Sequence, residues 1–222
     1  MEKYFEILKS VELFKDIEPS NLAILLNCLS VRPIKVKKNQ VILRIGEKAG
    51  IFGIVLLGEV QVYQDDYYGN RSVFDNIGPG HLFAEAFACS GEGALPVNVA
   101  STKDSEFVFI EYSKLSSPCP NACSFHKQMI QNMLNIIAAK NISLARKIEF
   151  MSKRTTREKL LSYLSSCARA SGGSRFFIPF NRQELADYLS VDRSGLSAEL
   201  GRMRDEGILK FHKNEFELFK KA

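Results

Sequence analysis

The 222 residues of the chain lack the features that mark membrane-spanning, secreted and disulfide-rich proteins. No stretch approaches the about 18 to 20 uninterrupted apolar residues that a membrane-spanning helix needs. The segment Met1–Glu6 has no basic region leading into an apolar run, which argues against a secretory signal. The five cysteines are an odd number without regular spacing, which argues against a disulfide framework. We therefore expect a cytoplasmic protein.

Catalytic patterns are also missing from the sequence. It contains no glycine-rich phosphate loop, no His-x-x-x-His pair and no nucleophile elbow. The three histidines, His81, His126 and His212, are too few and too scattered to nominate a catalytic set. We predict that the chain is not an enzyme.

What the sequence does contain is a localised positive charge. Residues 1–150 hold 16 basic and 16 acidic residues, whereas residues 151–222 hold 14 basic against 9 acidic, so the net charge of +5 lies in the last third. Such a footprint is expected of a segment that faces a polyanion. An ordinary solvated surface explains the charge equally well when nothing else is considered.

The first half of the chain predicts short helices followed by a β-domain. Ile24, Leu25 and Leu29 form a helical apolar face near the N-terminus. From Val31 to Ile110, short β-rich runs alternate with glycine turns, which is typical of an antiparallel barrel or jelly-roll-like sandwich. The runs are Val41–Leu43, Ile51–Leu57, Val60–Tyr63 and Phe107–Ile110.

A long helix is predicted next, over about Ala122–Phe150. Its apolar residues recur at heptad spacing with a single polar member, which is typical of a two-stranded coiled coil whose register a buried asparagine fixes. The predicted dimer seam consists of Ile130, Leu134, Ile137, Asn141, Leu144 and Ile148. In the alternative, this helix packs on its own barrel and Asn141 lies at the edge.

The last third predicts a winged helix-turn-helix. Lys153–Arg157 is a polar break suited to a hinge, and a helix over about Thr156–Ala170 follows it. The β-rich segment Phe176–Ile178 precedes the motif, and a hairpin about Lys213-Asn214 follows it. We thus divide the chain into a sensor β-roll with N-terminal helices (1–115), a dimerisation helix (116–150) and a DNA-binding domain (151–222), an α+β fold.

The two helices of the motif carry their own start and stop signals. Asn181 and Glu184 form a capping box, and Asp192 caps the second helix, which ends at Gly207. The small Ala186 allows the two helices to cross closely. Residues at one helical face point inward, and residues near the opposite face are available to a DNA groove. The inward set is Leu196, Leu200 and Met203, and the outward set is Arg193, Ser194, Ser197, Ala198 and Arg202.

These motifs resemble the Crp/Fnr superfamily of transcription regulators. The segments Arg182–Leu189, Val191–Ser197 and Glu206–Ile208 are similar to its winged helix-turn-helix, and Ile45–Ala49, Ile54–Val60 and Gly78–Phe83 are similar to its cyclic-nucleotide-binding-type β-roll. The resemblance covers nearly the whole chain in the same order. It implies a homodimer that binds double-stranded DNA at a palindromic operator, with RNA polymerase as a further partner if the protein is an activator.

The resemblance also implies the residues that contact DNA. Arg182 and Gln183 match positions that contact the DNA backbone, and Arg193 matches the position that reads guanine through a bidentate contact. The implied DNA-binding set is Arg182, Gln183, Arg193, Ser194, Gly195, Ser197 and Arg202. The chain departs from the commonest pattern at Ala198, where many relatives carry arginine, so the resemblance does not carry over one base-edge or phosphate contact at this position.

The β-roll departs further from the family pattern. Family members that bind a cyclic nucleotide use a glutamate, matched here by Glu85, and an Arg-Ser/Thr pair, which falls on Leu95-Pro96. Neither residue carries charge, so a buried phosphate would lose its charge-assisted partners and cyclic AMP is not the expected ligand. The effector is therefore unknown. Phe83, Phe87, Leu95 and Val97 line either a more apolar effector pocket or, in the alternative, an ordinary core.

Two other hypotheses remain from the sequence. Cys119, Cys123 and His126 are spaced to share one helical face and would provide three ligands for zinc or iron, or a redox pair. Small buried cysteines beside a structural histidine explain the same spacing. Finally, the winged domain would serve as a protein-interaction module if it does not bind DNA.

Overall fold

The computed structural model describes residues 2–91, 93–116 and 124–219. The chain forms two compact units, Met1–Ala138 and Ala139–Ala222, which are described one at a time. The fold is α+β, with an antiparallel β-roll in the first unit and a helix-turn-helix with a small sheet in the second, as the sequence predicts. In the described residues, no helix is both long and apolar enough to cross a membrane. The predicted three-part division of the chain stays a prediction.

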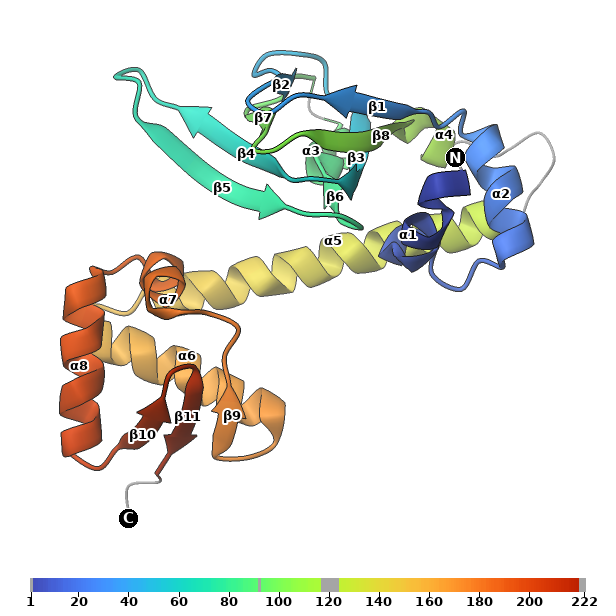
Figure 1. Ribbon diagram of the computed structural model, residues 1–222. Helices are drawn as coiled ribbons and strands as arrows, with labels where there is room; N and C mark the ends of the chain where they lie inside the picture. The colour runs from blue at the N-terminus through green and yellow to red at the C-terminus, as the bar shows by residue number, and fades with distance from the viewer. Residues whose placement is uncertain (1, 92, 117–123, 220–222) are drawn as a thin grey trace. The chain divides into compact units, whose positions relative to one another are not determined.

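The first unit begins with short helices and continues into eight strands (Figure 1). The helical elements are η1 (Glu2–Tyr4), α1 (Phe5–Ser10), η2 (Glu12–Phe14), α2 (Pro19–Cys28), α3 (Glu85–Ser90) and α4 (Tyr112–Ser116). The strands are β1 (Pro33–Val36), β2 (Val41–Leu43), β3 (Ile51–Leu57), β4 (Val60–Asp65), β5 (Arg71–Ile77), β6 (Leu82–Phe83), β7 (Asn98–Ser101) and β8 (Ser105–Glu111). Helix α5 (Ser124–Met151) runs from this unit into the second.

The strands form two four-stranded sheets with antiparallel pairing. Their orders are β1-β8-β3-β6 and β2-β7-β4-β5. Every strand of both sheets contributes a buried side chain to one apolar cluster. The interior of the roll is therefore packed with the protein's own side chains. These side chains include Val36, Leu43, Val55, Val60, Ile77, Phe83, Val99 and Phe107.

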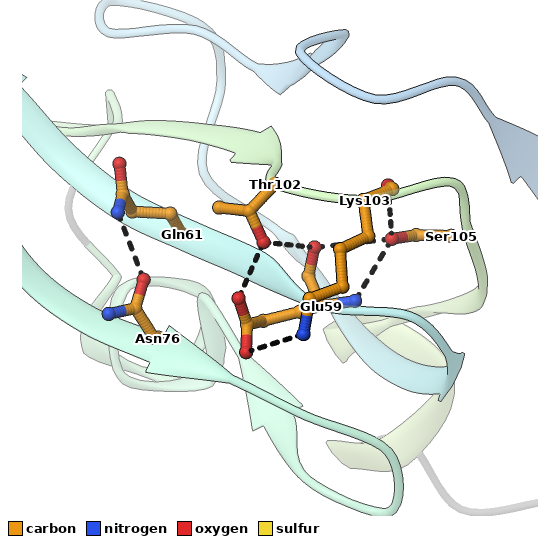
Figure 2. A network of polar contacts seen from close by, with 6 residues as sticks. All are labelled: Glu59, Gln61, Asn76, Thr102, Lys103 and Ser105. Atoms are coloured by element: carbon orange, nitrogen blue, oxygen red, sulfur yellow. Dashed lines mark hydrogen bonds and ion pairs between the residues drawn. The ribbon is translucent and has the colours of Figure 1, made fainter.

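The turn between β3 and β4 is fastened to the turn between β7 and β8 (Figure 2). Gly58 adopts a φ of +84°, and a Cβ there would lie 2.3 Å from Oγ of Ser105, so the turn requires glycine. The backbone N–H of Glu59 donates to Ser105 Oγ at 3.0 Å, and its carboxylate accepts from the Thr102 hydroxyl at 2.6 Å. This hydroxyl, aided by the nearby charge of Lys103, lowers the pKa of Glu59.

The N-terminal helices pack on the first half of α5 within the first unit. Met129 and Met133 of α5 are buried in the core that these helices share with the roll. The side-chain amide of Asn132 donates to the carbonyl oxygens of Leu13 at 3.0 Å and Lys15 at 2.8 Å. One face of α5 is therefore held by its own unit, in part as the alternative to the dimer seam supposes.

The second unit contains the end of α5 and the helix-turn-helix (Figure 1). Its further elements are α6 (Thr156–Ser171), β9 (Arg175–Phe177), α7 (Arg182–Leu189), α8 (Arg193–Asp205), β10 (Leu209–His212) and β11 (Glu215–Leu218). The small sheet has the order β10-β11-β9, which confirms the predicted wing and its preceding strand. Phe150 at the end of α5 is buried in the same core as α6, α7 and α8.

Candidate nucleic-acid interface

The helix-turn-helix is built from local capping interactions. The N–H of Glu184 donates to the Asn181 side chain at 3.0 Å, and the Glu184 carboxylate accepts from the Asn181 N–H at 2.7 Å, so the predicted capping box is present. The Asp192 carboxylate accepts from the N–H of Gly195 at 2.8 Å and so caps α8. Because each helix is fixed at its own N-terminus, the turn between them is specified locally.

The predicted division of α8 into two faces is confirmed. Leu196, Leu200 and Met203 are fully buried, and they share a core with Ala186 of α7. The residues at the opposite face are exposed to solvent from the first turn of the helix onward. They are Arg193, Ser194, Gly195, Ser197, Ala198 and Arg202.

Arg193 is the most available basic side chain at the start of α8. Within the described part of the chain it takes part in no hydrogen bond or ion pair, and the same holds for the Ser197 hydroxyl. All five N–H donors of its guanidinium are therefore free for a ligand. The N-terminal turn of α8 also presents backbone N–H groups that favour an anion such as a phosphate.

Ser194 is engaged within the motif. Its hydroxyl donates to the carboxylate of Asp192. This bond and the N–H of Gly195 lower the pKa of Asp192. Ser194 therefore presents acceptor lone pairs, not a free O–H, at the start of α8.

The two residues that match backbone-contacting positions also have partners inside the protein. The guanidinium of Arg182 lies 4.9 Å and 5.1 Å from the ring centroids of Phe211 and Phe216, and burial lowers the pKa of Arg182. The amide of Gln183 donates to Asp187 at 2.8 Å. Arg182 thus joins α7 to the wing, and its role as a DNA contact stays a prediction.

Arg202 belongs to a network of charged residues. The Glu199 side chain lies at the inward side of α8 and is 7% exposed. It accepts from Arg202 at 2.9 Å and from Nε of Arg157 at 2.5 Å. Arg157, on α6, also donates through Nη1 and Nη2 to the two carboxylate oxygens of Glu206 at 2.9 Å and 2.6 Å.

Sequence reasoning assigned Arg157 to a polar break and missed this network. The signal that was available is Glu199 itself, because it lies between Leu196 and Leu200 at the apolar side of α8. An acidic residue at that position requires a cationic partner from another element. The partner could not be named, since it lies 42 residues away.

Three of the effector positions predicted in the roll, Phe83, Leu95 and Val97, are buried in the protein's own core. The ring of Phe83 packs edge-on against Phe107 and Phe109, with centroids 5.6 Å and 5.9 Å apart. A Cβ at Gly53 would lie 2.0 Å from this ring, so glycine at that position makes room for it. The ring therefore lies directly against the backbone of β3.

The two residues at the predicted phosphate position, Leu95 and Pro96, differ in their exposure to solvent. Leu95 is buried in the roll core with Val97, while Pro96 is exposed. Glu85 is buried at the start of α3, and Phe87 is half-buried against the same core. Neither Leu95 nor Pro96 carries a positive charge, so these two residues cannot form a charge-assisted hydrogen bond with a phosphate.

A separate surface cleft of about 880 Å³ lies beside α3. Lys48, Cys89, Glu111 and Tyr112 are among the residues that line it. Burial raises the pKa of the Cys89 thiol to about 11, so this thiol is protonated near neutral pH. The cleft therefore offers the ammonium of Lys48, the carboxylate of Glu111 and several neutral polar groups, but no thiolate from Cys89.

Of the predicted cysteine cluster, His126 lies among the described residues. Cys119 and Cys123 lie outside the described residues. His126 is buried, stacks on Phe125 and has an Nδ1 atom with no hydrogen-bond partner in the described part of the chain. Among the residues that the structure describes, no three His, Cys, Asp or Glu side chains are placed to hold a metal ion.

The predicted dimer seam is exposed along α5. The side chains of four apolar members are between 37% and 66% exposed, Ile137 is half-buried and Asn141 is exposed. The four are Ile130, Leu134, Leu144 and Ile148. Four large apolar side chains in solvent along one helix leave an apolar stripe without a partner in the described chain.

Two family descriptions match the chain. A cyclic nucleotide-binding domain matches residues 33–119, and a Crp-like helix-turn-helix domain matches residues 158–219. No curated protein sequence matches the chain.

Solved structures share the fold over most of the chain. The catabolite activator protein of Thermus thermophilus is 18% identical, with a TM-score of 0.53 and coverage of 94% of this chain and 93% of that one. The c-di-GMP responsive regulator CLP of Xanthomonas campestris is 16% identical, with a TM-score of 0.55 and coverage of 90% and 100%. CprK complexed with OCPA is 14% identical, with a TM-score of 0.65 and coverage of 90% and 89%. At these identities the likeness concerns the fold alone.

Proposed function

We propose that this chain, which belongs to the Crp/Fnr family of DNA-binding transcription regulators, acts as a homodimer that reads a palindromic operator. The family consists of transcription factors and not enzymes, in agreement with the sequence prediction. One observation carries the proposal: the exposed N-terminal end of α8 presents Arg193 without any partner in the described part of the chain. A protein of this function works in the cytoplasm, and RNA polymerase is a partner if it activates transcription.

Arg193 is the residue that we assign to base reading. Its guanidinium is planar and free, so it suits bidentate contact with O6 and N7 of guanine in the major groove. Ser197 lies one turn further along the same face with a free hydroxyl. Ala198, beside it, contributes only a methyl group, which suits apolar contact with the C5-methyl of thymine.

The homodimer is supported by the exposed stripe on α5. Burying Leu134, Leu144 and their seam neighbours against a second copy removes apolar surface that one chain leaves in solvent. Asn141 lies within this stripe and would fix the register of the pair. Two copies related by a two-fold axis present two α8 helices to half-sites about one helical turn of DNA apart.

We propose that the effector is not cyclic AMP. Phe83 occupies the roll interior, and Leu95 and Pro96 offer no charge to a phosphate. Solved structures with this fold are described with different small molecules, since CLP is described as responsive to c-di-GMP and CprK as complexed with OCPA. The fold therefore leaves the effector of this chain unidentified.

Two alternatives to this proposed function rest on fewer observations. A metal- or redox-responsive regulator would use Cys119, Cys123 and His126. The observation in its favour is that Nδ1 of His126 has no hydrogen-bond partner among the described residues. Metal analysis of the purified full chain tests this alternative. A protein-interaction role for the winged domain predicts instead that nucleic acid is not bound with sequence preference.

Selection from a random-sequence DNA library tests the proposed function. We expect the full chain to enrich a palindrome, and its affinity for that palindrome to fall steeply as salt increases, because phosphate contacts release counterions. No enriched sequence, or an affinity that salt does not change, would contradict DNA reading and favour the protein-interaction alternative.

A further inference from the structure

Each of the three nitrogens of the Arg157 guanidinium has a hydrogen-bond partner inside the second unit. Its Nε donates to Glu199, and its two terminal nitrogens donate to the two carboxylate oxygens of Glu206. These bonds raise the pKa of Arg157 above its ordinary value. Although Arg157 adds to the positive charge of the C-terminal third, no nitrogen of its guanidinium lacks a protein partner. It is therefore engaged within the protein, in contrast to Arg193.

The two carboxylates that Arg157 binds lie at different positions along α8. Glu199 is in the middle of α8 and is buried, and Glu206 directly follows the helix end. One side chain from the first turn of α6 therefore holds α8 at its middle and at its C-terminal end. Two attachment points along an axis restrict both sliding and tilting of the helix, which a single ion pair does not.

The start of α6 is itself held in place. Thr155 caps this helix, and the carboxylate of Glu158 accepts from the backbone N–H groups of Arg154 and Thr155 at 3.1 Å each. Arg157 thus projects from a fixed first turn and not from a loose linker. The segment predicted as a hinge ends at the residue that contacts α8.

We propose that Arg157 is a positioning residue for DNA reading, which sets the place of α8 through Glu199 and Glu206 without contacting DNA. This inference rests on the proposed function of α8 as the reading helix. Specific contacts such as that of Arg193 require the helix at one position in the groove, whereas non-specific binding depends on phosphate contacts that tolerate displacement. Removal of Arg157 should therefore lower specific affinity more than non-specific affinity.

The test compares Arg157→Gln with a matched control. The control is Arg175→Gln, which removes the ion pair of Arg175 with Glu215 (2.6 Å) in the sheet of the same unit. With the palindrome enriched by the wild-type chain, we expect Arg157→Gln to weaken operator binding about tenfold to a hundredfold, a loss of the size seen for one base contact. Binding to a scrambled duplex should change less than about threefold, and the control should keep both affinities.

Two further variants keep the test decisive. Arg157→Lys retains the charge but loses the planar fork, so it should lower the ratio of specific to non-specific affinity as well. Glu206→Gln removes one carboxylate and leaves the bond to Glu199, so it should act in the same direction more weakly and serves if Arg157→Gln does not fold. Thermal unfolding of each variant accompanies the binding measurement.

Two outcomes would overturn the inference. One is a variant with lowered thermal stability and an unchanged affinity ratio, which would leave Arg157 with a structural role only. The other is a fall of about one in the slope of log affinity against log salt, which would mean that Arg157 contacts a phosphate directly. Failure of the wild-type chain to enrich any sequence would instead overturn the proposed function, and the inference with it.

Discussion

The interior of the β-roll and the outer face of α8 belong to the two matched domains, and they are built in opposite ways. In the roll, the side chains of Phe83 and Leu95 are buried in the apolar core. On α8, Arg193 reaches solvent with every donor unused within the described residues. The two regions differ in burial and charge, because Phe83 and Leu95 are buried and uncharged whereas Arg193 is exposed and basic. This difference is the basis of our proposals that α8 reads DNA and that the effector is not cyclic AMP.

The largest expected effect concerns the filled roll. Phe83→Ala removes a fully buried ring and should destabilise the first unit by about 3–5 kcal/mol, measured by thermal or denaturant unfolding. Phe177→Ala is the control, since that ring is 72% exposed and its removal should change stability by less than about 0.5 kcal/mol. Equal effects for the two substitutions would show that the roll interior is not a packed core.

The dimer seam provides the next effect. Leu144→Glu places a charge in the proposed interface of both copies, and each buried leucine contributes about 1.5–3 kcal/mol. We therefore expect the dimer dissociation constant to rise at least about a hundredfold in sedimentation equilibrium. Ile142→Glu is the matched control, because Ile142 is similarly exposed (54% against 61% for Leu144) but lies outside the heptad stripe. The same dissociation constant for both variants would contradict the seam.

The exposed face of α8 gives a somewhat smaller effect. Arg193→Ala should weaken operator binding by about 1–3 kcal/mol and leave dimerisation unchanged. Arg193→Lys keeps the positive charge and loses the fork, so it should retain the salt dependence of binding but lose most of the preference for guanine. Fluorescence anisotropy with the selected operator and single-base variants measures both. Unaltered specific affinity in Arg193→Ala would exclude this residue as a reader.

The smallest effect is the pH dependence of the α8 cap. Hydrogen bonds from Ser194 and Gly195 lower the pKa of Asp192 below its ordinary value of 3.8. A lowered pKa means that the carboxylate stabilises the folded unit above pH 3.8 and that this stabilisation is lost as the pH falls through the folded-state pKa. The Tm advantage of the wild type over Asp192→Asn should therefore shrink below about pH 4 in circular dichroism. An advantage that stays constant with pH would argue against the charged cap, since asparagine is also a good cap.

Local signals allowed much of the second unit to be predicted from sequence. Asn181, Glu184 and Asp192 act within three residues of their partners, so their capping roles could be read directly. The inward positions Leu196 and Leu200 follow from helical periodicity. Fold class and the order of roll, long helix and winged motif were predictable for the same reason.

Contacts between distant residues could not be predicted. Arg157 meets Glu206 across 49 residues, and the stacking of Arg182 on the wing rings depends on how the sheet folds back over α7. The strand β5 was missed because Arg71–Asn76 is exposed throughout and shows no alternation of apolar and polar residues. The seam prediction considered only the face of α5 that carries the heptad residues. It did not include a second face, which Asn132 attaches to the N-terminal helices of the first unit.

One titration tests the central claim that α8 reads DNA without cyclic AMP. The full chain is titrated against its selected operator and against a scrambled duplex, with and without saturating cyclic AMP. We expect the operator to bind at least about a thousandfold more tightly than the scrambled duplex and cyclic AMP to change neither affinity. Equal affinity for both duplexes, or tight operator binding only when cyclic AMP is present, would contradict it.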